Sequence, residues 1–105
     1  MSAWVILYTG KAESDLEAIF EYLAFELQEP NTAKKQLVRI IDAIDALSHM
    51  PFRYRLYDKE PWTSKGVRVL TVQNYLVFYQ PNEQTSAITI IRIMYGGRDI
   101  ESELI

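Results

Sequence analysis

The sequence predicts an α+β domain in which an N-terminal strand and an antiparallel helical hairpin precede a mainly antiparallel three-strand meander. The first half holds two segments whose apolar residues recur at helical spacing, with only a few residues between them. The last third holds three runs rich in β-branched and aromatic residues. We expect both helices to bury their apolar stripes on one face of the sheet. The 105 residues suit one domain spanning 1–105.

The N-terminal segment predicts a strand that leads directly into a helix. Residues 4–8 form a β-rich apolar run, and the Thr9 hydroxyl is suited to cap the helix that follows. We expect the strand to join the sheet, because a lone apolar strand exposes an unpaired backbone. The helix has an apolar face, formed by Ala12, Leu16, Ile19, Phe20, Leu23 and Leu27. Its opposite face, expected in solvent, is acidic and holds Glu13, Asp15, Glu17, Glu21 and Glu26.

A second helix is predicted after Pro30, which should end the first. It starts at Asn31-Thr32 and ends before Pro51. Its buried face is formed by Ala33, Leu37, Ile40, Ile41, Ile44 and Leu47. Because the connection is so short, the two helices should be antiparallel.

The rest of the chain predicts a loop and then three strands. Residues 52–65 lack a regular period and carry mostly basic charges, which indicates an irregular loop with a short strand near residues 54–57. The strands are expected at 66–72, 75–80 and 87–94, joined by a tight turn at Gln73-Asn74 and a longer one at 81–85.

Composition limits the chemistry and the compartment. Without cysteine the chain has no disulfide, thiolate nucleophile or cysteine zinc site, and it suits a reducing cytoplasm. It starts without a signal-peptide pattern and has no apolar run long enough to span a bilayer, so we expect a cytoplasmic protein with no membrane partner. Four basic and eight acidic side chains give residues 1–50 a net charge of −4, whereas seven and four give residues 51–100 a net charge of +3. An overall charge of −3 weakens a general nucleic-acid-binding role.

Three runs in the second half resemble a known family. They are Gly-Val-Arg-Val-Leu around Arg68, Asn-Tyr-Leu-Val-Phe-Tyr at 74–79, and Ile-Arg-Ile-Met-Tyr-Gly-Gly-Arg-Asp at 91–99. With the preceding strand and helical hairpin, they look like the RelE/ParE superfamily of type II toxin-antitoxin toxins, also described as plasmid stabilisation proteins. The resemblance covers nearly the whole chain. It implies a toxin neutralised by a cognate antitoxin, without a metal or other cofactor.

The resemblance implies one of two activities. RelE-like members cut messenger RNA at the ribosome, and in that case Arg68, Tyr95 and Arg98 would surround the scissile phosphate as charge donors and a proton-transfer group. ParE-like members inhibit DNA gyrase by binding. In that case the basic loop and the C-terminal corner would contact the target through Arg53, Arg55, Arg92 and Arg98.

The ParE-like mode is favoured by two departures from the nuclease pattern. Leu76 follows Tyr75 where the family's nucleases commonly have an arginine, and no lysine lies two residues after Arg68. The RNase mode stays open, as does a non-toxic module that retains only antitoxin binding. Arg68 and Arg92 also have a purely structural interpretation, in which they pair with carboxylates or pack along the sheet.

The chain has more large apolar side chains than two helices cover, including Trp4, Tyr54, Tyr57 and Trp62. We expect a partner to cover the excess. If the chain is a toxin, the antitoxin would lay a helix and an extended segment over the sheet edge and the basic corner. Both a homodimer and a toxin-antitoxin hetero-oligomer are compatible with the sequence.

Overall fold

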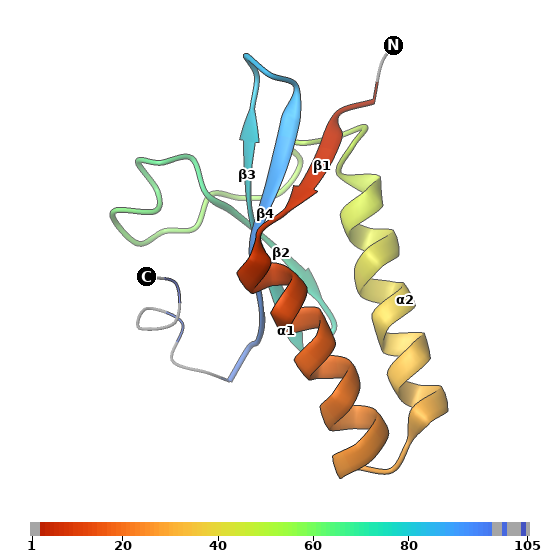
Figure 1. Ribbon diagram of the computed structural model, residues 1–105. Helices are drawn as coiled ribbons and strands as arrows, with labels where there is room; N and C mark the ends of the chain where they lie inside the picture. The colour runs from red at the N-terminus through yellow and green to blue at the C-terminus, as the bar shows by residue number, and fades with distance from the viewer. Residues whose placement is uncertain (1–2, 98–99, 101–103, 105) are drawn as a thin grey trace.

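The computed structural model describes residues 3–97, 100 and 104. The chain has an α+β architecture with a four-stranded sheet, as predicted (Figure 1). In chain order the elements are β1 (Val5–Tyr8), α1 (Gly10–Glu21), η1 (Tyr22–Glu26), α2 (Pro30–Ala46), β2 (Arg68–Val72), β3 (Tyr75–Asn82) and β4 (Ala87–Tyr95). None of the helices that these residues form is long and apolar enough to cross a membrane.

The strands follow the order β1-β4-β3-β2. β2, β3 and β4 form the predicted antiparallel meander, and β1 joins the sheet by pairing in parallel with β4, from Val5 opposite Ala87 to Tyr8 opposite Ile90. Because β1 ends at Tyr8 and β4 continues to Tyr95, the last part of β4 has no strand beside it on this side among the described residues. Helix α1 lies next to that part of β4.

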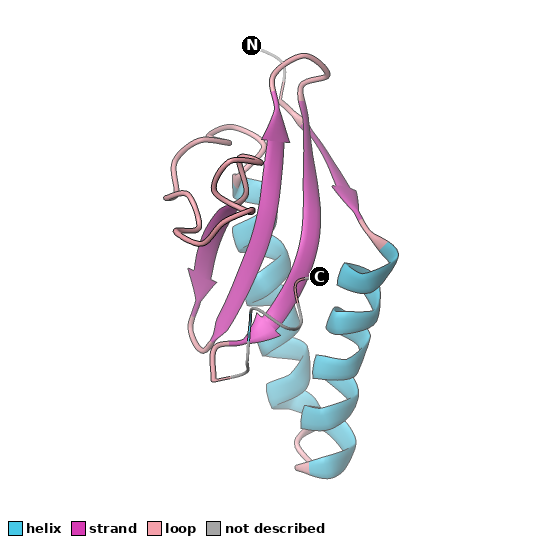
Figure 2. Cartoon of the chain, turned by 90° about the vertical axis from the view of Figure 1, so that its left-hand side faces the viewer, coloured by secondary structure: helices cyan, strands magenta, loops and turns pink. Residues whose placement is uncertain are grey.

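The two helices cover one face of the sheet and form the larger hydrophobic core there (Figure 2). Its buried residues are Ala12, Ile40, Ile44, Leu47, Leu70, Val72, Val77, Tyr79, Ile88, Ile90 and Ile93. In β2 and β3 every second side chain points to the helices, as with Leu70 and Val72 or Val77 and Tyr79. In β4 a register shift interrupts this alternation, so that Ile88 and Ile90 are followed by Ile93. In Figure 1 the tip of the helical hairpin extends beyond the end of the sheet.

The other face of the sheet is covered by the chain itself. A second cluster buries Tyr57, Val67, Val69, Phe78, Met94 and Leu104, with Trp62, Leu76, Ile91 and Ile100 against it. The long loop between α2 and β2 therefore takes up much of the apolar surface that we expected a partner to cover. Within that loop the expected short strand is reduced to a single bridge between Leu56 and Arg68.

The helical hairpin differs from the prediction at its tip. The first helix widens into the π-helical turn η1, where the Leu27 amide donates to the Tyr22 carbonyl, and the chain then reverses at Gln28 with φ of 54°. Pro30 does not simply end the first helix, because it is the first residue of α2. A proline is tolerated there because the first helical turn needs no amide donor from it.

Thr9 caps α1 as predicted and also ties it to the sheet. Its Oγ1 accepts from the Ala12 amide at 3.0 Å and donates to the Ile91 carbonyl at 2.8 Å. We expect Thr9→Ala to lower the free energy of unfolding by about 1 to 2 kcal/mol, measured by urea denaturation. Thr85→Ala, at an exposed turn position, is the control and should change it by less than about 0.5 kcal/mol. Equal effects of the two substitutions would contradict this role for Thr9.

Candidate functional site: a cleft between the helical hairpin and the sheet

An ion pair joins α1 to β4. Arg92 donates from Nε to Asp15 Oδ2 at 2.7 Å and from Nη2 to Oδ1 at 2.9 Å, and the Ile93 amide also donates to Oδ2 at 2.9 Å. Only 11% of the Arg92 side chain and 12% of the Asp15 side chain are exposed. The prediction that Asp15 belongs to a solvent-facing acidic face is therefore wrong. This placement favours the structural interpretation of Arg92 over a contact with a target.

Arg68 is used to hold the long loop. Its Nη1 donates to the Tyr54 carbonyl at 2.6 Å and to the Phe52 carbonyl at 3.4 Å, and its guanidinium lies 5.1 Å from the centre of the Phe52 ring. Two neighbouring arginines of the loop, Arg53 and Arg55, are exposed. Arg68 thus fixes the backbone on which these two cations are presented.

Arg68 and Tyr95, two of the three residues considered for RNA cleavage, lie apart on the sheet. Arg68 is opposite Tyr79 of β3, whereas Tyr95 is opposite Tyr75, four residues away along the same strand. At 3.3 Å per residue this separates them by roughly 13 Å along the sheet. Arg98 lies outside the described residues. The half-exposed Tyr95 instead packs edge to face on Tyr75, with 5.8 Å between the ring centres.

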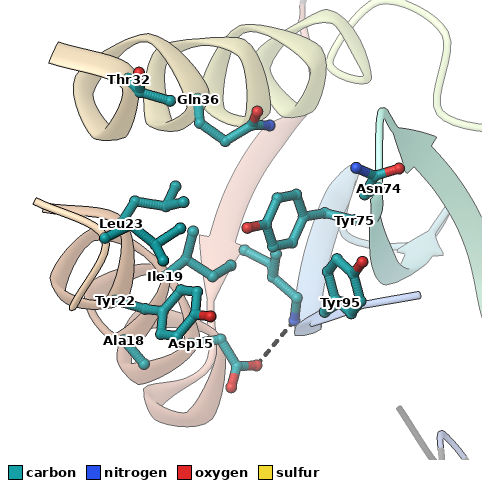
Figure 3. A pocket seen from close by; sticks show the side chains of 12 residues that line it. Asp15, Ala18, Ile19, Tyr22, Leu23, Thr32, Gln36, Asn74, Tyr75 and Tyr95 are labelled. Carbon is teal, nitrogen blue, oxygen red and sulfur yellow. Dashed lines mark hydrogen bonds between the residues drawn. The ribbon is translucent and has the colours of Figure 1, made fainter. Parts of the chain in front are cut away.

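A cleft of about 830 Å³ separates the outer half of the helical hairpin from the end of the sheet (Figure 3). Its helical wall is formed by Ala18, Ile19, Tyr22, Leu23, Leu27, Thr32 and Gln36. Its opposite wall is formed by Asn74, Tyr75, Ile93 and Tyr95, with Asp15 at the base. No local sequence pattern indicates this cleft, because its two walls come from segments that are far apart in the chain.

The cleft is mainly apolar but carries phenol and amide groups. Burial raises the pKa of Tyr75 above its usual value, and the nearby Tyr95 and Tyr22 phenols raise it further. Gln36 on the helical wall is 9% exposed, and its Nε2 has no hydrogen-bond partner among the described residues. The only sequence signal for Gln36 was a polar residue at helical spacing between Ala33 and Ile40. Such a pocket, with a few placed polar groups, suits binding of an apolar segment.

The described residues include no group of three or more histidine, aspartate or glutamate side chains placed to hold a metal ion. The acidic group nearest the cleft, Asp15, already accepts three hydrogen bonds from Arg92 and Ile93.

Comparison with protein families gives a match over residues 6–100 to the ParE toxin of the type II toxin-antitoxin system parDE. The chain belongs to this family. A search of curated proteins gives no match. The family assignment agrees with the resemblance noted in the three runs of the second half, and it makes the chain a type II toxin-antitoxin toxin of the ParE/RelE superfamily.

Solved structures share the architecture of this ParE family member. A chain from the chromosomal ParDE system of P. aeruginosa is 25% identical, with a TM-score of 0.71, and the match covers 89% of this chain and 96% of that one. A chain of the RelBE2 toxin-antitoxin complex of Mycobacterium tuberculosis is 17% identical, with a TM-score of 0.66 and coverage of 89% and 98%. A chain of the archaeal RelE-RelB complex of Pyrococcus horikoshii is 14% identical, with a TM-score of 0.62 and coverage of 91% and 98%. The last two likenesses concern the fold alone.

The ion pair predicts a strong dependence of stability on Asp15. We expect Asp15→Ala to lower the free energy of unfolding by about 3 kcal/mol, because it leaves the Arg92 guanidinium buried without its carboxylate. Adding Arg92→Met should recover part of this loss. Glu17→Ala, at an exposed position of the same helix, is the control and should change the value by less than about 0.5 kcal/mol in urea denaturation. A double variant no more stable than Asp15→Ala would contradict the argument.

The raised pKa of Tyr75 predicts alkaline sensitivity. Its phenol loses a proton near pH 10 in the unfolded chain and at higher pH in the folded chain, so the free energy of unfolding should fall as pH rises above about 10. Tyr75→Phe should make this fall shallower without removing it, because burial also raises the pKa of Tyr8 and Tyr79. Urea denaturation at pH 9 and pH 11 measures the free energy of unfolding of the unaltered protein and of Tyr75→Phe. A decrease of equal size in the two proteins would contradict the raised pKa of Tyr75.

Proposed function

We propose that this chain is a ParE-like toxin that inhibits DNA gyrase by binding, without chemistry of its own, and is neutralised by a cognate antitoxin. The observation that carries the proposal is the match to the ParE toxin model over residues 6–100. The likeness to a ParDE chain supports the same mode. It also supports a paired antitoxin, since that structure is of a toxin-antitoxin system.

The side-chain geometry gives less support to the RNase alternative. Cleavage of an RNA phosphodiester needs a proton-transfer group and cations gathered within a few ångströms of one phosphate. Arg68 is bound to loop carbonyls at one end of the sheet, and Tyr95 packs on Tyr75 at the other. Arg92 is committed to Asp15.

The loop between α2 and β2 is the proposed surface for the target. It carries Arg53 and Arg55 in exposed positions, and Arg68 holds the backbone beside them through the Tyr54 carbonyl. Cations on a backbone that is already ordered lose less entropy when they bind an acidic surface. Arg98 is retained as a further target contact on the strength of the sequence alone.

Two other surfaces are proposed for the antitoxin. The cleft would take the apolar face of a helix, and its outer rim is formed by Tyr22 and Leu27, which are 55% and 49% exposed. An extended antitoxin segment would add to the outer edge of β1, which pairs only with β4 among the described strands and exposes Val5 and Leu7.

The proposal is tested by inducing the protein alone in a bacterial host. We expect growth arrest, loss of plasmid supercoiling and intact transcripts at ribosomes. With purified gyrase, the Arg53→Ala/Arg55→Ala double variant should need a roughly fivefold higher concentration for half inhibition, which corresponds to about 1 kcal/mol. The control is Lys34→Ala/Lys35→Ala, which removes two exposed cations from α2 instead.

Cut transcripts with normal supercoiling would replace the gyrase mode by the RNase mode. Normal growth on induction would indicate the third alternative, a module that keeps antitoxin binding and has lost toxicity. Co-expression with the product of the adjacent gene should restore growth if that product is the antitoxin.

A further inference from the structure

One polar side chain interrupts the buried face of α2. The buried residues of this helix are Ala33, Gln36, Ile40 and Ile44, three or four positions apart. Gln36 is 9% exposed, and its Nε2 donates to no acceptor among the described residues. A buried amide without a partner costs free energy that an apolar side chain of similar length would avoid. Packing alone therefore does not explain a glutamine here.

Gln36 faces the cleft, where a bound partner would reach it. Figure 3 shows Gln36 on the side of α2 that faces Tyr75 on the opposite wall. The surrounding helical wall is apolar and includes Ile19 and Leu23. The Nε2 atom of Gln36 is already shielded from solvent in the free chain, so its missing hydrogen bond is a cost that exists before any partner binds. An apolar helix that covers this wall would relieve the cost only if it brings an acceptor to which the Gln36 side chain can turn.

We propose that Gln36 is a specificity-determining residue for the antitoxin, in which its Nε2 donates a hydrogen bond to an acceptor oxygen on the helix that fills the cleft. This inference rests on the proposed antitoxin pairing. A helix that brings such an oxygen pairs a donor that is unpaired in the free chain, whereas a helix of equal hydrophobicity without the oxygen leaves it unpaired and gains no such hydrogen bond. An apolar groove would otherwise discriminate weakly among amphipathic helices.

The proposal predicts opposite effects of one substitution on stability and on binding. Gln36→Met keeps the chain length and removes the donor, so the melting temperature of the free toxin should rise. Its Kd for the antitoxin, the purified product of the adjacent gene, should increase about tenfold. Gln84→Met, at an exposed position of the turn after β3, is the matched control and should change neither quantity. Calorimetric titration and thermal unfolding measure the two effects.

A second substitution tests the direction of the hydrogen bond. Gln36→Glu offers only acceptors at pH 7, so it should weaken antitoxin binding at least as much as Gln36→Met. If Gln36→Glu binds as tightly as the original protein, the occupant brings a donor and the proposal is overturned. Unchanged affinity of Gln36→Met overturns it as well, and so does a lower melting temperature of that variant, which would make the amide a structural group.

A measurement on the unaltered protein does not depend on how the variants fold. The side-chain NH₂ resonances of Gln36 should shift downfield, and their exchange with solvent should slow, when the antitoxin is added. Unchanged resonances in a formed complex would overturn the role of Gln36 while leaving the antitoxin pairing intact. If the unaltered toxin and the adjacent gene's product do not associate at all, the proposed pairing itself fails.

Discussion

The position of the helical hairpin depends on how α1 is attached to the part of β4 that has no strand beside it. β1 is four residues long and β4 is nine. Since Tyr8, the last residue of β1, is opposite Ile90, β1 does not pair with the part of β4 that follows Ile90. Thr9 and Asp15 supply the missing hydrogen bonds. The Thr9 hydroxyl donates to the Ile91 carbonyl, and the Asp15 carboxylate accepts from the Ile93 amide. A buried backbone group without a partner is costly, so these contacts determine where α1 begins and which side it presents to the sheet.

The same attachment explains why a cleft exists. Contacts to β4 hold the first half of α1 near the sheet, while the tip of the hairpin extends past the end of the strands (Figure 1). Apolar side chains of the outer half then have no strand residues to cover them. Tyr22 and Leu27 remain about half exposed at the rim, and Gln36 faces the space between the walls. The cleft thus follows from a hairpin that is longer than the sheet beneath it.

The arginines show how a strand position limits function. Arg92 and Arg68 are on strands at either side of β3, and each is already bound, the first to a carboxylate and the second to loop carbonyls. Arg92 and Arg68 therefore contribute by positioning the segments that they bind. Arg92 stabilises the base of the cleft, and Arg68 orders the loop that presents Arg53 and Arg55. The cleft proposed for the antitoxin therefore lies beside the end of β4, whereas the loop proposed for the target is held to β2.

By itself the sequence determined the α+β class, the two helices, the antiparallel meander and the Thr9 cap, because spacing of apolar residues, turn residues and caps act over a few positions. Only the tertiary structure decided that β1 pairs in parallel with β4, that Asp15 is buried against Arg92, and that Arg68 and Tyr95 are far apart. It also decided that the long loop covers the second face of the sheet and that Gln36 faces a cleft. The physical reason is distance along the chain: Asp15 and Arg92 are 77 positions apart, and no local pattern specifies which carboxylate a strand arginine will meet.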